Sequence, residues 1–393
     1  MGRRAAFHTL GCKVNQYETE GLKENFKKAG HEVVPDTEFA DAYVINTCTV
    51  TNLADRKSRQ FIRRARAINP DAAIAVTGCY VQVAPEEVAA IEGVDIIAGT
   101  NEKSAMVSLV EEYIKDGSKI RQVKSYEELD TYEEIGTITS MESRTRAYIK
   151  IQEGCDRFCS YCIIPFARGS VRSRRPSEIL KEAESLVRAG FKELILTGIN
   201  AALYGTEQGF VCDIDDTDIE NMHGIEIIIH LLDKMPGDFR IRLSSLEPTA
   251  ANSDYVKRLL EYDRLCHHLH LSIQSGSSSI ISAMNRNYTR EDYLDIVKVL
   301  RDKDLHYGIT TDIIVGFPGE TDEDFADSMN MVREADFLKV HAFQYSKRKG
   351  TAAALMDNQI EPQIKKSRSA DLIAEADRVS KEFMTACTGE IRQ

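Results

Sequence analysis

The sequence predicts an α/β protein with an N-terminal doubly wound parallel sheet followed by an open, partial barrel of six βα units. Two observations predict this fold class. Short apolar runs alternate with helical segments along almost the whole chain, a pattern typical of parallel sheets covered by helices. The chain also has 393 residues, of which 42% are hydrophobic, and this is enough for two or three domains of ordinary size.

Residues 1–115 form the first predicted domain, in which strand-like runs are separated by segments with helical spacing. Short strand–helix–strand units of this kind predict a parallel sheet with helices on its faces. The expected strands are 5–10, 43–46, 73–76 and 96–98, and the expected helices are 17–29 and 56–67.

A cysteine comes just after the end of three of these predicted strands: Cys12, Cys48 and Cys79. Ligands of doubly wound sheets collect at the carboxyl edge of the strands. Three thiols at one edge are suited to hold one metal cluster, and we favour this interpretation. The alternative is that each thiol is a small buried apolar residue.

The second part of the chain repeats the alternation. Residues 116–143 are acidic and poorly periodic, and we expect a linker there. Residues 144–360 are expected to form the partial barrel, because six strand–helix units are too few for a full eight-unit barrel. Residues 361–393 are expected to contain a C-terminal helix. The expected barrel strands are 148–153, 193–196, 239–243, 268–273, 308–315 and 338–343, with Ser177 and Thr289 as helix caps.

A CxxxCxxC run follows the first expected barrel strand, at the mouth of the barrel where this architecture places its sites. Its thiols are Cys155, Cys159 and Cys162. A 4Fe–4S cluster held by three cysteines has one iron without a protein ligand, and that iron is available to a substrate or cofactor. A zinc site needs a fourth ligand, which the nearby sequence does not offer. A redox CxxC pair would leave Cys155 unexplained.

The thiols are expected to be reduced. The chain has nine cysteines and lacks the apolar core of a secretory signal at its start, so a disulfide framework is not expected. It also lacks the run of roughly eighteen apolar residues that a membrane span requires. We therefore expect a cytoplasmic protein with no membrane partner. His267, His268 and His270 are expected to pack or to face solvent rather than to bind metal.

Cations gather in three segments, although the net charge of the chain is −12. The segments are 56–66, 168–175 and 347–349. Such segregation can steer a polyanion to one face of a protein. The alternative is that each segment is a solvated helix face.

Because its Cys155, Cys159 and Cys162 loop opens a partial barrel, the second domain resembles a radical S-adenosylmethionine (SAM) enzyme. The resemblance implies that these thiols bind a 4Fe–4S cluster whose open iron chelates the amino and carboxylate groups of SAM. It also implies that one electron cleaves SAM to methionine and a 5′-deoxyadenosyl radical, which abstracts a hydrogen atom from the substrate.

Three segments of the first domain resemble the signature segments of methylthiotransferases. In that family the matching cysteines hold a second 4Fe–4S cluster, whose open iron carries the sulfur to be transferred. The resemblance implies two SAM molecules, of which one methylates this sulfur and the other yields the radical that activates carbon 2 of an adenine. The resembling segments are 9–18 with Cys12, 46–50 with Cys48 and 77–80 with Cys79.

The same resemblance places contacts to SAM at the ends of the barrel strands. The aromatic residue of the cysteine loop, Tyr161, occupies a position that packs near the adenine in relatives. The other expected contact residues are Thr197, Gly198, Asn200, Ser244, Ser245, Glu247, Gln274 and Phe343.

The sequence around Cys12 and the run 345–351 most resemble bacterial enzymes that modify N6-threonylcarbamoyladenosine beside the tRNA anticodon. This implies the anticodon loop of tRNA as substrate and a reductant such as flavodoxin or ferredoxin. We expect segments 56–66 and 347–349 to contact tRNA phosphate. Relatives commonly end in a small RNA-binding β-barrel, and 361–393 is too short for a complete one.

Other substrates and one other class of protein are alternatives. A methylthiotransferase of this kind can act on isopentenyladenosine in tRNA or on an Asp of a small-subunit ribosomal protein. From a different class, the chain could be a non-catalytic iron–sulfur protein that binds RNA or transfers electrons.

Overall fold

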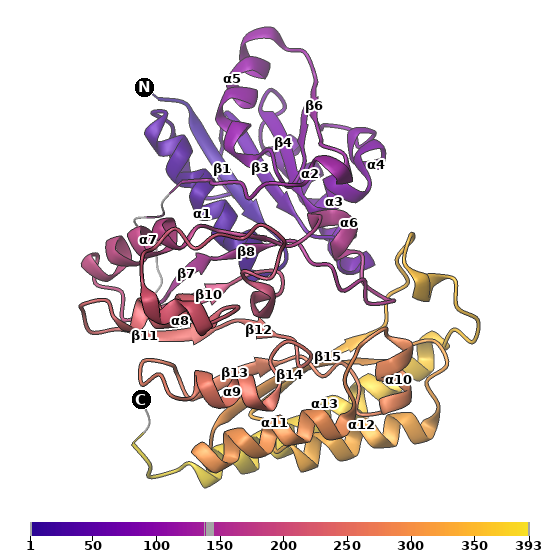
Figure 1. Ribbon diagram of the computed structural model, residues 1–393. Helices are drawn as coiled ribbons and strands as arrows, with labels where there is room; N and C mark the ends of the chain where they lie inside the picture. The colour runs from indigo at the N-terminus through magenta and orange to yellow at the C-terminus, as the bar shows by residue number, and fades with distance from the viewer. Residues whose placement is uncertain (1, 137, 139–144, 392–393) are drawn as a thin grey trace. The chain divides into compact units, whose positions relative to one another are not determined.

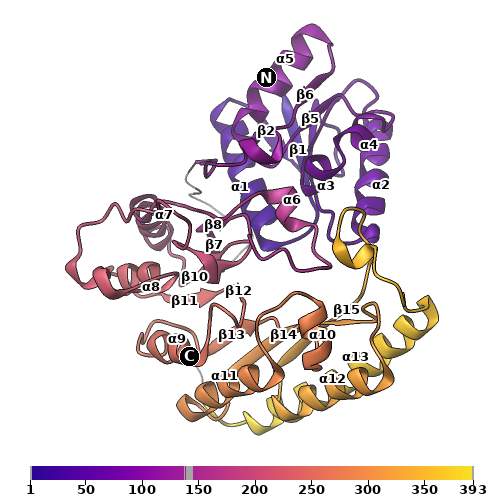
Figure 2. The ribbon, with the colours of Figure 1, turned by 45° about the vertical axis from the view of Figure 1, so that its right-hand side comes forward.

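The computed structural model describes residues 2–136, 138 and 145–391. The chain divides into two compact units, and the segment around the CxxxCxxC run contributes to both. Figures 1 and 2 show the elements of each unit, coloured along the chain. Unit 1 comprises residues 1–144, 148–156 and 163–174, and unit 2 comprises residues 145–147, 157–162 and 175–393.

Unit 1 is built on a six-stranded sheet in the order β2-β1-β3-β4-β5-β6, and each neighbouring pair runs parallel. The register places Ala5 opposite Ala42 and Val44 opposite Ala75. The central strands β3 and β4 are buried over their whole length, as parallel strands covered on both faces are. The strands are β1 (Arg4–Thr9), β2 (Glu32–Val34), β3 (Ala42–Thr47), β4 (Ala73–Gly78), β5 (Ile96–Ala98) and β6 (Ile120–Gln122).

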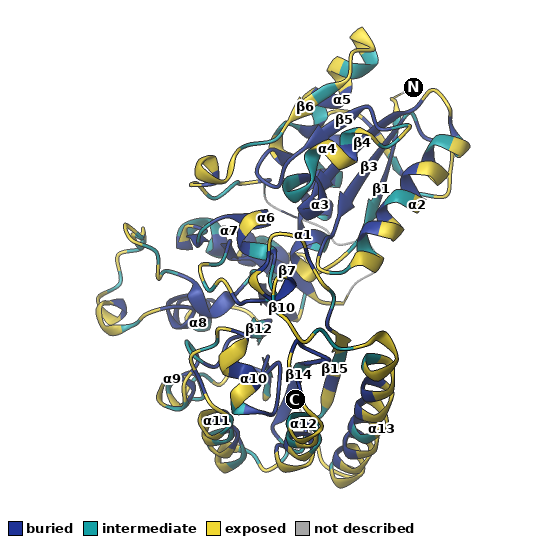
Figure 3. Cartoon of the chain, turned by 90° about the vertical axis from the view of Figure 1, so that its right-hand side faces the viewer, coloured by how far each residue is buried: buried dark blue, intermediate teal, exposed yellow. Residues whose placement is uncertain are grey.

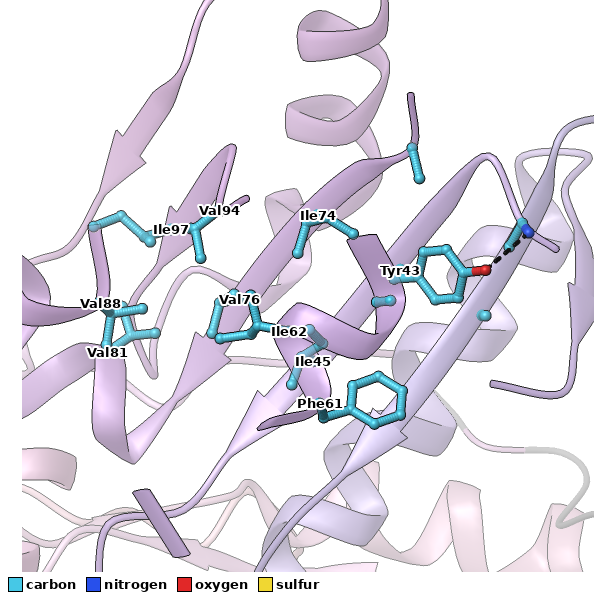
Figure 4. Packing of buried hydrophobic residues seen from close by; sticks show 14 of the residues in the cluster. Tyr43, Ile45, Phe61, Ile62, Ile74, Val76, Val81, Val88, Val94 and Ile97 are labelled. Atoms are coloured by element: carbon cyan, nitrogen blue, oxygen red, sulfur yellow. Dashed lines mark hydrogen bonds between the residues drawn. The ribbon is translucent and has the colours of Figure 1, made fainter. Parts of the chain in front are cut away.

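Helices cover both faces of this sheet, so the predicted doubly wound arrangement is confirmed (Figure 1). On one face, Leu22 and Phe26 of α1 (Lys13–Lys28) pack in one core cluster with Leu109 of α5 (Met106–Asp116). On the other face, Phe61 and Ile62 of α2 (Asn52–Ile68) join a cluster that also takes in α3 (Cys79–Val83) and α4 (Pro85–Ala89). Figure 4 shows this second cluster.

Three parts of unit 1 differ from the expectation. β2 is too short, at three residues, to show alternation in the sequence. β6 lies inside the range 116–143 that we expected to be a linker, and it pairs with β5. Residues 137 and 139–143 of that range lie outside the described residues. The unit also receives β8 (Gln152–Glu153), α6 (Ile164–Arg168) and β9 (Arg172–Ser173), and β8 pairs antiparallel with β9.

Unit 2 has the repeated strand–helix order expected of a partial barrel, and the predicted fold class is confirmed. β10 (Glu193–Thr197) pairs in parallel with β11 (Arg240–Leu243). A four-stranded parallel sheet has the order β12-β13-β14-β15. Its strands are β12 (Ser245–Leu246), β13 (His268–Leu271), β14 (Gly308–Val315) and β15 (Lys339–Gln344), and β7 (Ala147–Lys150) is the strand that precedes the cysteine loop.

The helices of unit 2 bury one side and expose the other, most visibly α11, α12 and α13 (Figure 3). The predicted cap at Thr289 is confirmed, because its hydroxyl accepts the N–H of Asp292 in a capping box. The predicted cap at Ser177 is wrong: the helix begins with Pro176, whose fixed φ suits that position, and the Ser177 hydroxyl donates to Asp213. The helices are α7 (Pro176–Arg188), α8 (Glu226–Asp233), α9 (Ser253–Leu259), α10 (Ser278–Ala283), α11 (Arg290–Lys303), α12 (Asp322–Glu334) and α13 (Pro362–Ala386).

The two faces of β13 differ in polarity. Leu269 and Leu271 are fully buried, whereas His268 and His270, which alternate with them, are half-buried. Successive side chains of a strand point to opposite faces of the sheet. One face of β13 is therefore apolar and packed, and the other is lined with polar side chains.

Candidate active site and cluster-binding residues

The three N-terminal cysteines lie at the carboxyl ends of three adjacent strands, β1, β3 and β4. Cys12 is the N-cap of α1, Cys48 directly follows β3, and Cys79 is the first residue of α3 after β4. Burial, and then the neighbouring thiol of Cys79, raises the pKa of Cys48 to about 12, and Cys12 acts in the same direction. Because the carboxyl ends of adjacent parallel strands meet at one edge of a sheet, the structure places the three predicted residues at the same edge.

Two glycines make the close approach of these segments possible. Gly11 has φ +103°, and a Cβ there would lie 2.9 Å from the Sγ of Cys48. Gly78 has φ +97°, and a Cβ there would lie 2.4 Å from the carbonyl oxygen of Thr47. Both backbones are in the region that glycine adopts at little cost. Both positions therefore require glycine, because of the backbone conformation and because a side chain would not fit.

A cluster of charged side chains lies buried beside Cys79, and sequence reasoning did not find it. Arg168 Nη1 lies 2.5 Å from Glu18 and 3.1 Å from Glu153. Lys150 contacts both carboxylates, and Lys103 Nζ lies 3.3 Å from Glu18. The side chains of all five residues are at most 3% exposed. Burial alone would raise the pKa of Glu18, but the charges of Arg168 and the two lysines hold it well below its usual range.

Arg168 also contacts one of the predicted ligands, Cys79, directly. Its Nε lies 3.2 Å from the Sγ of Cys79, and its Nη2 donates to the side-chain oxygen of Asn15. The segment 168–175 was expected to be a possible polyanion-binding surface, and this expectation is wrong. Arg168, Arg172 and Arg174 are buried and bonded inside unit 1, because carboxylates and carbonyls distant in the sequence take up their charge.

The part of the cysteine loop that belongs to unit 2, residues 157–162, is held in place by hydrogen bonds from backbone and side-chain groups. Ser160 donates from its N–H to the carbonyl oxygen of Met284 at 3.0 Å, and from its hydroxyl to Ala283 at 2.8 Å. The side chain of Asn285 donates to the carbonyl oxygen of Phe158, whose φ of +44° is unusual for an aromatic residue. These bonds fix the backbone around Cys159, which is buried, while Cys155 and Cys162 are partly exposed.

Glu247 is the centre of a hydrogen-bond network near this loop. Its Oε2 accepts from Nε of Arg157 at 2.7 Å and from the side-chain amide of Asn200 at 3.1 Å. Arg286 lies 3.9 Å from the other oxygen of Glu247, and it donates to the hydroxyl of Tyr161 at 2.9 Å. The structure therefore links three of the expected SAM contacts, Tyr161, Asn200 and Glu247.

The remaining expected contacts are placed as follows. Thr197 ends β10 and is buried, and Gly198 follows it. Ser244 is buried between β11 and β12, and its hydroxyl oxygen has no hydrogen-bond partner among the described residues. Gln274 has φ +69°, a strained value for this residue type. Ser245 begins β12, and Phe343 of β15 is exposed.

The polar face of β13 and β14 forms a second network that the sequence did not reveal. His270 lies 3.1 Å through Nε2 from Oδ2 of Asp312 and 2.9 Å through Nδ1 from the hydroxyl of Thr310. Ser272 donates to the same carboxylate oxygen at 3.0 Å, and one ligand atom of His341 lies within 4.8 Å of those of His270 and Asp312. His270 is thus half-buried and packed within this network, and its predicted lack of a metal stays a prediction.

Comparison with known proteins places the chain in a family. Residues 149–332 match the Radical SAM superfamily, and residues 4–99 match Uncharacterized protein family UPF0004. The chain is 43% identical over 386 residues to the threonylcarbamoyladenosine tRNA methylthiotransferase MtaB of Bacillus subtilis, covering 98% of this chain and 83% of that protein. This chain belongs to the radical SAM methylthiotransferase family.

Other methylthiotransferases are also similar to this chain. The tRNA-2-methylthio-N(6)-dimethylallyladenosine synthase of Alkaliphilus oremlandii is 35% identical to it, covering 95% of this chain and 78% of that protein. A solved structure of the radical SAM methyltransferase TsrM from Kitasatospora setae shares the fold, with a TM-score of 0.65 at 14% identity over 90% of this chain and 74% of that one. Membership of the radical SAM family implies a 4Fe–4S cluster and SAM as cofactors.

The other two basic segments of this methylthiotransferase are only partly on the surface. In α2, Arg56, Lys57, Arg63 and Arg64 are exposed, whereas Arg66 pairs with Asp95 at 2.5 Å. In the segment 347–349, Lys347 and Lys349 are exposed and Arg348 is buried. None of the described helices is both long enough and apolar enough to cross a membrane.

Proposed function

We propose that this methylthiotransferase adds a methylthio group to carbon 2 of N6-threonylcarbamoyladenosine next to the anticodon of tRNA. One observation carries the proposal: the 43% identity to the Bacillus subtilis enzyme spans almost the whole chain. The identity to the dimethylallyladenosine synthase is lower, at 35%. Isopentenyladenosine and an Asp of a ribosomal protein are the alternative substrates.

Each set of three cysteines would hold one 4Fe–4S cluster. Cys155, Cys159 and Cys162 would bind the cluster that receives SAM, and Cys12, Cys48 and Cys79 would bind a second one. Three thiols suit a cluster with one open iron. The thiols of unit 1 follow adjacent strands at one edge of the sheet, and the missing side chain of Gly11 leaves room beside Cys48, so these residues fit such a group. When bound, the clusters and SAM would supply the radical and the sulfur that the reaction needs.

The residues around Glu247 would bind and orient SAM. Glu247 holds Asn200 and Arg157 at hydrogen-bond distance, and Arg286 fixes the ring of Tyr161. The buried hydroxyl of Ser244 has no partner among the described residues, so it is available to a ligand. We extend the proposal to Thr197, Gly198, Ser245, Gln274 and Phe343 on the basis of their positions at strand ends.

The polar face supports the choice of substrate. A threonylcarbamoyl group carries a carboxylate, a hydroxyl and amide N–H groups, whereas an isopentenyl group is apolar. His270, Asp312, His341 and Ser272 offer donors and acceptors. A site that hydrogen-bonds a polar group rejects analogues that lack it.

The exposed cations of α2, with Lys347 and Lys349, would contact the phosphates of tRNA. The adenosine must leave the anticodon stack to reach a buried radical. The cluster that cleaves SAM needs one electron, and we propose flavodoxin or ferredoxin as its source. A cytoplasmic location follows from these partners.

Mass spectrometry of tRNA nucleosides tests the substrate. A deletion strain should lose the methylthio derivative of threonylcarbamoyladenosine, and a plasmid copy of this chain should restore it. Loss of the methylthio derivative of isopentenyladenosine alone would show that the chain acts on isopentenyladenosine in tRNA. An unchanged nucleoside profile would favour the ribosomal protein or a non-catalytic role. If the chain has a non-catalytic role, anaerobically reconstituted protein would fail to cleave SAM with dithionite as reductant.

A further inference from the structure

The buried charge cluster of unit 1 carries more positive than negative charge. Lys103, Lys150 and Arg168 are three cations, and Glu18 and Glu153 are two anions, so one positive charge remains. Glu102 is also buried, and burial, opposed in part by the charge of Lys103, raises its pKa.

Fold stability does not explain such a cluster. Taking ions out of water costs free energy that ion pairs in the interior only partly return. An uncompensated buried charge is costly unless an anion faces it. The atom that faces Arg168 on its remaining side is the Sγ of Cys79, 3.2 Å from Nε. The guanidinium of Arg168 therefore faces the sulfur of Cys79, which is anionic whenever it binds metal.

We propose that Arg168 is a positioning residue for the auxiliary cluster: its guanidinium supplies the counter-charge and an N–H donor to the sulfur of Cys79, and so stabilises the cluster in its more reduced state. This rests on the proposed function, which assigns that cluster to Cys12, Cys48 and Cys79. Hydrogen bonds to cluster sulfurs and nearby charge are among the factors that set the reduction potential of iron–sulfur clusters.

The geometry of Arg168 matches this role. Nη1 is held by Glu18 and Glu153, and Nη2 by Asn15 and Glu18, which leaves Nε to face Cys79. A planar guanidinium offers these donors in a fixed fork, and a lysine keeps the charge but not the fork. Replacing arginine by lysine therefore separates the directed N–H···S bond from the charge.

The position of Arg168 in the chain adds a second consequence. It ends α6, and the residue after it, Gly169, accepts a hydrogen bond at 3.0 Å from the backbone N–H of Cys155. A Cβ at Gly154 would lie 1.7 Å from the carbonyl oxygen of Ser170, so the backbone at Gly154 is in close contact with the backbone at Ser170. Two consecutive residues thus contact both sets of cysteines. Gly169 binds the backbone of Cys155, and Arg168 supplies the N–H donor to Cys79.

The test uses the full chain with Cys155, Cys159 and Cys162 changed to alanine, so that only the auxiliary cluster can form. In this background, Arg168→Lys is compared with Arg172→Lys. Arg172 is a matched control, because it is also buried in unit 1 but bonds to the carbonyl oxygen of Leu129 rather than to sulfur. Iron content, circular dichroism and an EPR-monitored redox titration are measured after anaerobic reconstitution.

Arg168→Lys should shift the midpoint potential to a more negative value, or lose iron from a folded protein, while Arg172→Lys does neither. Equal potentials in the two variants would overturn the proposal, as would equal loss of iron in both. If the background with Arg168 intact binds no iron, the proposed second cluster itself fails, which is a different result from an unshifted potential.

Discussion

His270 and Asp312 face one another across the adjacent strands β13 and β14, with 3.1 Å between Nε2 and Oδ2. Burial opposes the charge of Asp312, but the hydrogen bond from His270 and its partial charge lower the pKa of this carboxyl. The same carboxylate oxygen accepts from the hydroxyl of Ser272 at 3.0 Å, so the two strands present an ordered polar surface.

We predict that His270→Asn lowers kcat/KM for a threonylcarbamoyladenosine stem-loop by roughly 10- to 100-fold, since a lost hydrogen bond to a charged group costs about 1.5–3 kcal/mol. Cleavage of SAM without substrate should change little. His267→Gln is the matched control, because His267 is exposed and pairs with Asp304 instead. Equal values for both variants would show that this face does not contact the substrate.

Gly11→Ala should disrupt the auxiliary site. The new Cβ would lie 2.9 Å from the Sγ of Cys48 at a φ of +103°, so the sulfur must move. Iron per chain should fall from about eight atoms to about four, since one of two 4Fe–4S clusters is lost. Gly30→Ala tests the backbone effect alone, because Gly30 has φ +89° with nothing within 4 Å of its Cβ position. Full iron content in Gly11→Ala would contradict the proposed ligand set.

Glu247→Gln should weaken SAM binding. The amide cannot accept equally from Arg157 and Asn200, and it leaves the guanidinium of Arg157 without its anion. We expect the Kd for SAM to rise about tenfold or more, as for a lost charge-assisted hydrogen bond. Equilibrium binding of SAM to reconstituted protein measures this. Glu261→Gln is the control, since Glu261 is exposed, and a Kd unchanged in Glu247→Gln would remove Glu247 from the SAM site.

Reversing the charge of Arg63 and Arg64 should weaken tRNA binding. Both side chains are exposed on α2. Removing two phosphate contacts should reduce the slope of log K against log salt by about 1.4, taking about 0.7 for each contact to a single strand. The double change Lys298→Glu with Lys381→Glu, at exposed positions of α11 and α13, has the same charge and should leave the slope unchanged. A slope equal to that of the original protein would exclude α2 from the interface.

The buried carboxylates predict how stability depends on pH. The charges around Glu18 and Glu153 lower the pKa of both against the effect of burial. Groups with depressed pKa values in the folded state stabilise it above their ordinary value, here 4.5, and lose that contribution as the pH falls through the folded value. The midpoint of thermal unfolding should therefore fall steeply below about pH 4.5.

Glu18→Gln separates this effect from general acid denaturation. It should cost about 3–5 kcal/mol at pH 7, because it leaves buried cations without their anion, and its further loss in acid should be shallower. Glu112→Gln, at an exposed site on α5, should follow the original curve. Parallel acid profiles for all three proteins would show that Glu18 is not ionised in the folded state.

Local patterns in the sequence sufficed for much of the fold. Periodicity located the strands that carry Cys12, Cys48 and Cys79, because a buried parallel strand is a short apolar run. β2 and β6 were not predicted because each has three residues that include charged or polar ones, whereas the equally short β5 is a wholly apolar run. The acidity of the region around β6 also pointed to a linker rather than to an edge strand.

The charge cluster lay beyond any local pattern. Arg168 and Glu18 are 150 positions apart, and Lys150 and Glu18 are 132 apart. Charged residues are rarely buried, so nothing in the sequence marked these side chains as neighbours. The contact between His270 and Asp312 was not predicted for the same reason, since the two residues are 42 positions apart. Only the packed chain shows which opposite charges meet.

The exchange of segments between the units limits how this protein can be dissected. A fragment that stops at residue 144 contains Glu18 and Lys103 but not Lys150, Glu153 or Arg168. In that fragment the carboxylate of Glu18 would lack Lys150 and Arg168, and Cys79 would lack the guanidinium of Arg168. A fragment that keeps the whole buried charge cluster of unit 1 must therefore also include residues 148–156 and 163–174.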